Sequence, residues 1–557
     1  MEGRIIRTCS VFAGLLAASA VLIPAPAAAV VRFDSARAYL EARAAAISGN
    51  HTRSAQLLAQ IADTGSASST IQREAVSQAI SAGDMRLALR LVKTLPPAST
   101  PIDAKLLLVA DALRSNDGSR ALSFLQPTGE PTDISFLRAF VEAWVAADSR
   151  DLSRALSTLD ALSARNMLAA LVPENRALIL LKFGKIADAD PYVAQALKVG
   201  GGREQRLRLA FADSYVALGD KARALSMADG MGTEAPRERD RIQRGQFSGP
   251  RIDNGRRAFS ELLVVLAGEL ERLQNETMPV TLSQVARYTA PENSSTTITL
   301  GLMLDRHDRV DDAIAAFRSV PTSDGLASRA RDGEVRALDG AGRKDEAVQV
   351  AQRAIADGLN SVTDYARLGD AYEAVDKHAE AAAAYTQALQ LAGNARAEDR
   401  WPLMVLQASA LEEGDRWAEA RAILLQALAL APEEPVILNF LGYAKLERGE
   451  DLDAAEAMIR KASALAPDDA SITDSLGWAL YKRGRLDEAI EVLSRAAKGD
   501  PTQAEIREHL GDALYKAGNR YEARYAWSAA LATADDKIAT RVKAKLAAGL
   551  TPTSAAP

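Results

Sequence analysis

A period of about 34 residues recurs along this chain and restricts the folds it can adopt. Gly477 and Gly511 lie 34 residues apart, as do Ala489 and Ala523, and each pair holds the same place in its unit. A unit this short cannot bury its apolar residues alone, so consecutive units must stack against one another. The period therefore predicts a linear array of units rather than a fold around one globular core.

The clearest unit shows how the sequence would form a helical hairpin. Leu476, Leu480 and Leu493 recur at helical spacing and predict two helices that share one apolar interior. Gly484 would end the first helix, because glycine accepts the left-handed dihedral angles of a helix end. Pro501 would end the second helix, because proline cannot continue it. Each unit is thus expected to be a helix-turn-helix.

This pattern resembles the tetratricopeptide repeat (TPR), with Leu-Gly in the first helix, a glycine turn, and an alanine that opens the second helix. The resemblance implies an all-α fold, a TPR-type α-solenoid in which hairpins form a right-handed superhelix. The opening alanine marks where two helices approach too closely for a larger side chain, and it recurs upstream at similar spacing. It is found at Ala55, Ala88, Ala121, Ala155, Ala189, Ala224, Ala313, Ala347, Ala381, Ala420 and Ala455.

The register breaks once, between Ala224 and Ala313, and divides the array into two arms joined by an irregular unit. Gly, Arg and Pro residues at the start of the break indicate a loop, and leucines on one face then indicate a long helix. The predicted organisation is a signal peptide (1–29), divergent TPR-like hairpins (30–229), a loop or linker (230–255), an irregular helical pair (256–290), TPR-like hairpins (291–395), well-formed TPR units (396–535), a capping helix (536–549) and a disordered tail (550–557).

The expected capping helix is amphipathic and would cover the apolar edge of the last hairpin. Its basic residues have two interpretations: an anionic partner could bind them, or they form a solvated face that the helix dipole favours. We prefer the solvated face. The residues concerned are Lys537, Arg541, Lys543 and Lys545.

The first residues have the pattern of an export signal. Arg4 and Arg7 precede a short apolar run at 11–23, and Ala27 to Ala29 are typical of a cleavage site. The run is shorter than the roughly 20 apolar residues of a membrane-spanning helix. We therefore expect export and cleavage after Ala29 or Ala27. A retained anchor is the alternative.

Cys9 is the only cysteine of the chain. The residues before it, Ile6-Arg7-Thr8, differ from the Leu-small-small box of bacterial lipoproteins, so we do not expect an acyl anchor. After cleavage no cysteine would remain for a disulfide bond or a thiolate metal site.

The sequence offers little for catalysis. His-Glu-x-x-His, Gly-x-Ser-x-Gly and Walker A patterns are all missing from it. Its net charge of −6 is spread over interspersed acidic and basic residues, which does not favour a nucleic-acid partner. We expect no enzymatic activity, no cofactor and no bound metal. The four histidines, His51, His307, His378 and His509, are expected to be surface or capping residues.

Residues 254–550 are similar to a more specific group, on the strength of Asn254-Gly255-Arg256, Asp474-Ser475-Leu476-Gly477-Trp478 and His509-Leu510-Gly511-Asp512. They resemble a family of bacterial envelope TPR proteins, some of which are outer-membrane lipoproteins that act as adaptors for a carboxyl-terminal processing protease. The resemblance implies a periplasmic location, in some contact with the outer membrane, and a protein partner such as that protease. This chain departs from it by lacking the lipoprotein box.

Two other functions stay open at this point. The array could be a structural component of a polysaccharide-export or outer-membrane assembly machine, in which it would act as a rigid spacer. A hydrolase could also lie in the irregular region at 230–288, which would require a compact pocket with paired carboxylates.

A partner is expected in the concave groove that the first helices of such hairpins line. Aromatic residues form only 5% of the chain, so several of them on one surface indicate binding anchors. Tyr443 and Trp478 could instead pack between units. Tyr481 and Tyr515 are expected to be exposed, because each follows a buried leucine by one position, a rotation of about 100°. The predicted groove residues are Asn439, Tyr443, Asp474, Trp478, Tyr481, Lys482, Glu508, Asp512, Tyr515 and Lys516.

One mode of TPR recognition does not fit these residues. Some TPR proteins grip a carboxylate with a clamp that needs asparagine after the Leu-Gly pair. Tyr443, Trp478 and Asp512 occupy that position here. We therefore expect an extended or helical peptide rather than a clamped carboxyl terminus.

Overall fold

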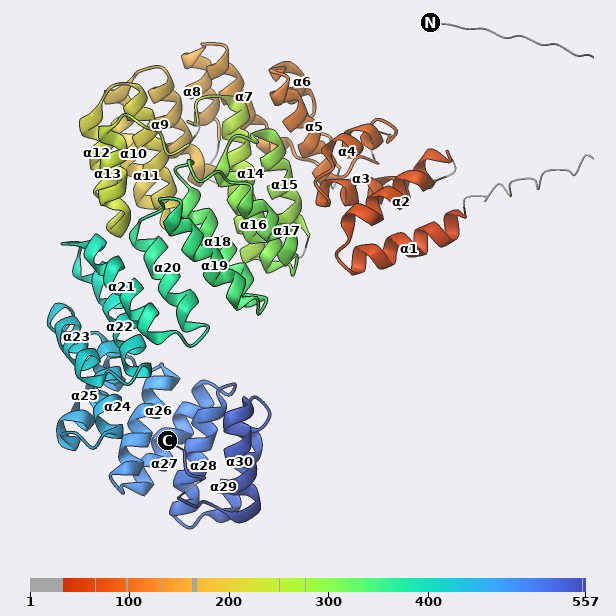
Figure 1. The fold of residues 1–557 in the computed structure, drawn as a ribbon. Coiled ribbons are helices and arrows are strands. Elements are labelled where there is room, and N and C mark those ends of the chain that lie inside the picture. Colours follow the sequence, from red (N-terminus) through yellow and green to blue (C-terminus); the bar gives the residue numbers. More distant parts are fainter. Residues whose placement is uncertain are drawn as a thin grey trace, which may run out of the picture.

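The computed structural model describes residues 34–557, apart from 66, 97–98, 131, 163–167, 250, 276, 553 and 557. Within these residues α-helices and short 3₁₀ helices are the only regular elements, and successive helices pair into hairpins along a curved array (Figure 1). The prediction of an all-α solenoid is confirmed. The expected signal peptide and Cys9 lie outside the described residues.

The N-terminal arm is formed by six hairpins in chain order, with short 3₁₀ turns before some helices. Its elements are α1 (Ser35–Ile47), α2 (His51–Asp63), α3 (Ser69–Ser81), α4 (Met85–Val92), α5 (Ile102–Arg114), α6 (Gly118–Ser123), η2 (Ser135–Leu137), α7 (Arg138–Asp148), α8 (Leu152–Asp160), η3 (Ala169–Leu171), α9 (Val172–Lys182), α10 (Ile186–Val199), η4 (Gly201–Arg203), α11 (Glu204–Ala217) and α12 (Lys221–Ala228).

An irregular stretch follows, and then the hairpins resume as the C-terminal arm. The irregular elements are η5 (Gly232–Glu234), α13 (Ala235–Gln243), α14 (Gly255–Arg272) and α15 (Met278–Thr289). The C-terminal arm has α16 (Ser294–Arg306), α17 (Val310–Arg318), α18 (Ala327–Gly340), α19 (Lys344–Ala356), α20 (Val362–Glu373), α21 (His378–Ala392), α22 (Ala397–Glu413), α23 (Trp417–Leu430), α24 (Pro435–Glu447), α25 (Leu452–Leu465), α26 (Ala470–Lys482), α27 (Leu486–Gly499), α28 (Ala504–Lys516), α29 (Arg520–Ala530) and α30 (Asp536–Ala548).

The repeat positions have the mechanical roles that the sequence predicts for them. Every opening alanine lies in the second helix of a hairpin and is at most 1% exposed. A Cβ on Gly477 would come within 2.5 Å of Leu493 Cγ, so only glycine permits this approach of α26 to α27. Gly484 has a φ of +77° in the turn between the same helices. Close helix contact and sharp turns therefore set the period.

The expected linker at 230–255 is not a continuous loop, which corrects the prediction. Helix α13 occupies part of it. Its buried Arg241 bonds Asp213 of α11 at 2.8 Å, which fixes α13 to the last N-terminal hairpin, and also bonds Glu238 of α13 itself at 2.6 Å. Pro236 suggested a break in the sequence, yet it lies in the first turn of α13, where a helix tolerates proline.

The irregular pair α14–α15 packs against the first helices of the N-terminal arm (Figure 1). Helix α14 contacts α5 and α7, and α15 contacts α3 and α5. Phe259 and Leu263 of α14 belong to the same apolar core as Phe140 and Trp144 of α7. The pair is also bonded to the arm at its ends, where Tyr288 Oη donates to Asp111 at 3.0 Å. The concave side of the N-terminal arm is thus filled by the chain itself.

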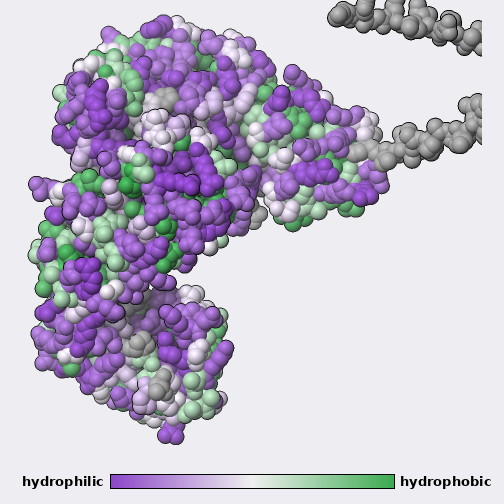
Figure 2. Space-filling model, in the orientation of Figure 1, coloured by the Kyte–Doolittle hydropathy of each residue, from purple (hydrophilic) through white to green (hydrophobic). Residues whose placement is uncertain are grey.

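The C-terminal arm bends away from this filled lobe and curls at its far end (Figure 1). The space-filling view shows an open concavity between the two lobes, with a largely hydrophilic surface (Figure 2). Helix α30 lies over the last hairpin, and its buried Val542 packs in one cluster with Trp527 and Ala530. None of the described helices combines the length and apolar character that crossing a bilayer requires.

Candidate protein-binding groove

The ten predicted groove residues lie on α24, α26 and α28, the first helices of three successive hairpins. The fold brings their side chains into one continuous set of contacts. Trp478 Nε1 of α26 donates to Glu447 Oε1 of α24 at 3.0 Å, and Lys482 Nζ lies 3.2 Å from the other oxygen of Glu447. Lys516 of α28 places its Nζ 4.4 Å from the centre of the Tyr481 ring of α26.

Three stacked rings form the centre of this set, and we call Tyr481, Trp478 and His509 the aromatic column. The ring centres of Tyr481 and Trp478 are 4.5 Å apart, and those of Trp478 and His509 are 4.1 Å apart. The rings are nearly parallel, at 14° and 16°. The column therefore joins α26 to α28 through a buried stack.

Burial of the aromatic column corrects the expected exposure of Tyr481 and decides between the two alternatives for Trp478. Tyr481 was expected to be exposed, but only 7% of it is accessible, because it stacks on Trp478 and lies beneath Lys516. Trp478 is fully buried, which favours packing between units over a free anchor. Tyr443 and Tyr515 are half-buried, so each keeps one accessible side.

His509 is a further correction, because it was expected at the surface or as a cap. It is fully buried, and its Nδ1 lies 2.8 Å from Asp474 Oδ2. Burial alone would lower the pKa of the imidazole, but the Asp474 carboxylate outweighs it and the pKa lies above its ordinary value.

Polar atoms in this region carry unused hydrogen-bonding capacity. Among the described residues, no partner is found for the buried atoms Asp474 Oδ1, Asn439 Oδ1 and His509 Nε2. Asp474 and Asn439 hold equivalent positions on α26 and α24, so two acceptors lie side by side along the array. Buried acceptors without donors are costly unless a donor reaches them.

Burial raises the pKa of the Tyr443 hydroxyl, and the negative charges of four carboxylates on four helices raise it further. These residues are Glu447 of α24, Glu505 of α28, Asp474 of α26 and Glu412 of α22. We call these four residues the acidic groove. Only part of its charge is compensated: Arg448 pairs with Glu412 at 2.9 Å and Lys482 pairs with Glu447. The exposed Glu505 has no ion pair among the described residues.

Two predicted groove residues are covered by other parts of the chain, both of them by α30 and Asp512 also by Ala556. Glu508 and Asp512 are fully buried, and Lys545 Nζ of α30 lies 2.6 Å from Glu508 Oε1 and 2.8 Å from Asp512 Oδ2. The expectation that Lys545 is solvated is therefore wrong. Burial raises the pKa of Asp512 against the opposing Lys545, whereas Arg541 and Lys545 hold the pKa of Glu508 below its ordinary value despite burial.

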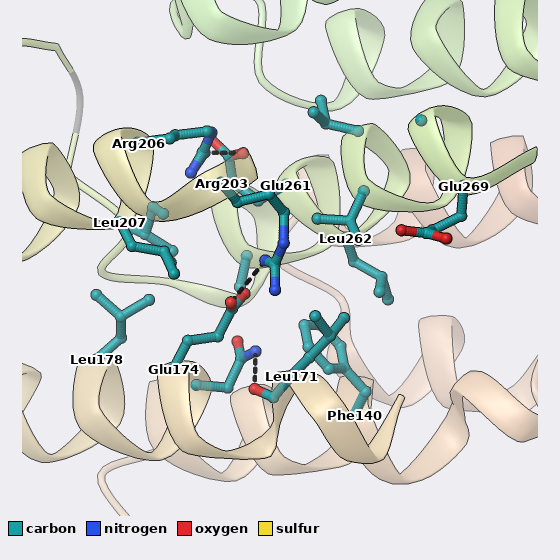
Figure 3. A pocket seen from close by; sticks show the side chains of 16 residues that line it. Phe140, Leu171, Glu174, Leu178, Arg203, Arg206, Leu207, Glu261, Leu262 and Glu269 are labelled. Carbon is teal, nitrogen blue, oxygen red and sulfur yellow. Dashed lines mark hydrogen bonds and ion pairs between the residues drawn. The ribbon is translucent and has the colours of Figure 1, made fainter. Parts of the chain in front are cut away.

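The N-terminal arm has a small cavity beside α14, of about 180 Å³ (Figure 3). Phe140, Leu171 and Leu262 give it an apolar lining, and ion pairs lie at its edge. Arg203 pairs with Glu174 at 2.6 Å, and Arg206 pairs with Glu261. The third carboxylate of the lining, Glu269, pairs with Arg272, so each carboxylate of this cavity is held by an arginine.

Metal binding finds no support in the part of the chain that the structure describes, where no group of three or more His, Cys, Asp or Glu side chains could hold an ion. The groove of the C-terminal arm, with acceptors, carboxylates and half-buried tyrosines, is the better candidate site.

Two segments of the chain match family models, residues 365–394 as a tetratricopeptide repeat and residues 477–518 as a TPR repeat. The second segment contains the C-terminal end of α26 and all of α27 and α28. The chain therefore contains tetratricopeptide repeats, and they include the aromatic column. No curated protein matches the chain.

Solved structures with similar helical arrays were also found. A chain of the APC/C hetero-tetramer Cut9–Hcn1 is 14% identical, with 93% of this chain and 97% of that chain covered and a TM-score of 0.38. Yeast Tom70 is 12% identical, with 79% and 94% covered and a TM-score of 0.39. A tetratricopeptide repeat protein from Parabacteroides merdae is 12% identical, with 46% and 97% covered and a TM-score of 0.38.

Proposed function

We propose that this chain is an exported, periplasmic scaffold whose acidic groove binds an extended, basic segment of a partner protein. The observation that carries the proposal is the buried Asp474 Oδ1, for which the described residues offer no donor, together with the exposed Glu505, which forms no ion pair among them. A lysine or arginine side chain, or backbone N–H groups, would supply the missing donors. Tyr443 and Tyr515 would add apolar contact area on either side.

The N-terminal pattern of Arg4, Arg7 and the apolar run at 11–23 supports export, and the resemblance of residues 254–550 to bacterial envelope TPR proteins supports a periplasmic location. The same resemblance supports a carboxyl-terminal processing protease as one partner, with this chain as its adaptor. A scaffold needs no catalytic centre of its own, which agrees with the arginine-bound carboxylates of the N-terminal cavity.

The groove is tested with a labelled heptapeptide, Ala-Ala-Lys-Ala-Lys-Ala-Ala, and its counterpart with glutamate in place of both lysines. Fluorescence anisotropy should show binding of the lysine peptide that weakens with salt, and no binding of the glutamate peptide. Asp474→Asn combined with Glu505→Gln should weaken binding about 10-fold or more. Glu491→Gln is the matched control, because Glu491 is an exposed carboxylate on the second helix α27.

The identity of the partner is tested by photo-crosslinking from positions 443 and 482, followed by mass spectrometry of envelope extracts. The scaffold hypothesis predicts one dominant partner that disappears in the Asp474→Asn, Glu505→Gln variant. Equal binding of both heptapeptides, or capture that is unchanged in this variant, would contradict the proposed groove. A function that depends only on the length of the array would then favour the rigid-spacer alternative.

A further inference from the structure

The segment that follows α30 turns back onto the concave side of the C-terminal arm. Gly549 ends α30 with a φ of +81°, and it lies so close to the Tyr515 hydroxyl that an added Cβ would overlap it. The backbone N–H of Thr551 then donates to Ser554 Oγ at 2.9 Å, and the N–H of Ala555 donates to Thr551 O at 3.0 Å. These bonds form a turn that directs the chain toward α28.

We call residues 551–556, apart from 553, the C-terminal segment. The sequence predicts that it is disordered, and the structure corrects this: Ser554 and Ala556 are only 5% and 6% exposed. The N–H of Ala556 donates to Asp512 Oδ2 at 3.0 Å, and Ala556 belongs to the same apolar cluster as Trp478 and Tyr481. The segment therefore covers the end of the groove next to the aromatic column.

The attachment of the C-terminal segment to the arm is slight. Among the described residues, the bond from Ala556 to Asp512 is the only hydrogen bond that joins the segment to α28, and the side chains of the segment are small. A tethered segment acts at an effective concentration of roughly millimolar, so a ligand of moderate affinity can compete with it.

We propose that the C-terminal segment is an internal competitor that covers the Asp512 end of the groove until a partner segment displaces it. This inference rests on the proposed function of the same groove. The chemistry of the contact also defines what the partner presents at that end: an extended stretch of small residues with an unblocked backbone N–H that reaches Asp512. Space is limited nearby, because a Cβ at Gly549 would overlap the Tyr515 hydroxyl and Lys545 Nζ lies 2.8 Å from the same Asp512 oxygen.

The test uses the chain truncated after Leu550, which retains all of α30, beside the full chain. The tryptophans are replaced by 5-fluorotryptophan for ¹⁹F NMR. Trp527 reports on the site, because its Nε1 donates to Asp512 Oδ1 at 2.9 Å. The probe is the acetylated peptide Thr-Pro-Thr-Ser-Ala-Ala-Pro, which repeats residues 551–557. Its matched control carries N-methylalanine at the place of Ala556 and so lacks the donor.

We expect truncation to shift the Trp527 resonance and millimolar peptide to return it, whereas the N-methyl peptide leaves it shifted. The truncated chain should also bind the lysine heptapeptide at least 3-fold more tightly than the full chain does. An unchanged Trp527 resonance on truncation, or equal action of the two seven-residue probes, would overturn the inference.

The two proposals fail in different ways. Equal affinity of the truncated and full chains for the lysine heptapeptide overturns the internal competitor and leaves the acidic groove standing. Lack of any lysine-peptide binding by both chains overturns the acidic groove, even where the Trp527 resonance responds to the probe.

Discussion

The two arms use the same hairpin but treat their concave sides differently. In the N-terminal arm, α14–α15 fills the concave side and shares its apolar core, with Phe259 fully buried. In the C-terminal arm the concave side is lined by charged and aromatic residues, and its end is covered by a short segment that, among the described residues, is bonded to α28 through Ala556 and Asp512. Helices that fill a concave side become part of the hydrophobic core. A few small residues that cover one can still be displaced by a partner.

The largest expected effect tests whether α14 is part of the N-terminal core. Phe259→Ala should destabilise the N-terminal arm by about 3–5 kcal/mol, because it removes a fully buried ring and leaves a cavity. Hydrogen exchange of residues 35–289 would measure it, since local opening need not involve the C-terminal arm. Leu273→Ala, at an exposed residue beyond the same helix, should change stability by less than about 0.5 kcal/mol. Protection lost equally in both arms would contradict separate cores.

The next largest effect tests the buried ion pairs between α30 and α28 in the C-terminal arm. Lys545→Met would leave Glu508 and Asp512 buried without their shared ammonium group, although Arg541 still pairs with Glu508. Removal of one member of a buried ion network lowers the free energy of unfolding by about 3–5 kcal/mol. We expect about 3 kcal/mol here, because Arg541 still pairs with Glu508. Urea unfolding followed by tryptophan fluorescence would measure it. Lys543→Met is the control on the exposed face of α30, and equal costs for both substitutions would contradict the network.

Alanine substitution of one glycine in each region should change stability in opposite directions. Gly477→Ala should destabilise the C-terminal arm by about 1–3 kcal/mol, because the added Cβ would lie 2.5 Å from Leu493 Cγ. Gly268→Ala on α14 has no atom within 4 Å of the added Cβ and should stabilise the helix by up to about 1 kcal/mol. Thermal unfolding of both variants would measure the difference. The same sign for both would mean that close helix approach does not set the repeat.

Local features of the fold were predictable from the sequence, and long-range ones were not. The opening alanines identified the hairpins, because a small residue at a fixed period reflects contact between neighbouring helices. The period does not fix the curvature of the array, and curvature decides what meets the concave side. The packing of α14–α15 in the N-terminal arm therefore went unpredicted, as did helix α13 and the contact of Ala556 with Asp512.

In the candidate site, too, the position of a residue along its helix was predictable, whereas its burial by other helices was not. Repeat positions placed Asn439, Asp474 and Tyr443 on the first helices of successive hairpins, and the structure confirms these positions on α24 and α26. Burial of Tyr481, Glu508 and Asp512 was missed, because a residue that faces the groove in an isolated hairpin is covered by the next helix or by α30. His509 was missed since a single histidine in a helix carries no pattern of its own.

The smallest effect comes from two histidines whose pKa values are displaced in opposite directions. Burial lowers the pKa of His51 in the N-terminal arm, where its Nδ1 faces Gln78 at 2.8 Å. For His509, the carboxylates of Asp474, Glu505 and Asp512 outweigh burial and raise the pKa. The protonated form is thus disfavoured at His51 and favoured at His509.

The signs of the pH dependence follow from these directions. The stability that His509 contributes is fully present below its unfolded pKa of about 6.5 and is lost as pH rises through its folded pKa. The stability that His51 contributes is fully present above its unfolded pKa and is lost as pH falls through its folded pKa. His509→Gln should therefore cost more at pH 5.5 than at pH 9, and His51→Gln more at pH 9, measured by urea unfolding at each pH. The His509 dependence should vanish in an Asp474→Asn background, and its survival there would show that another group carries the titration.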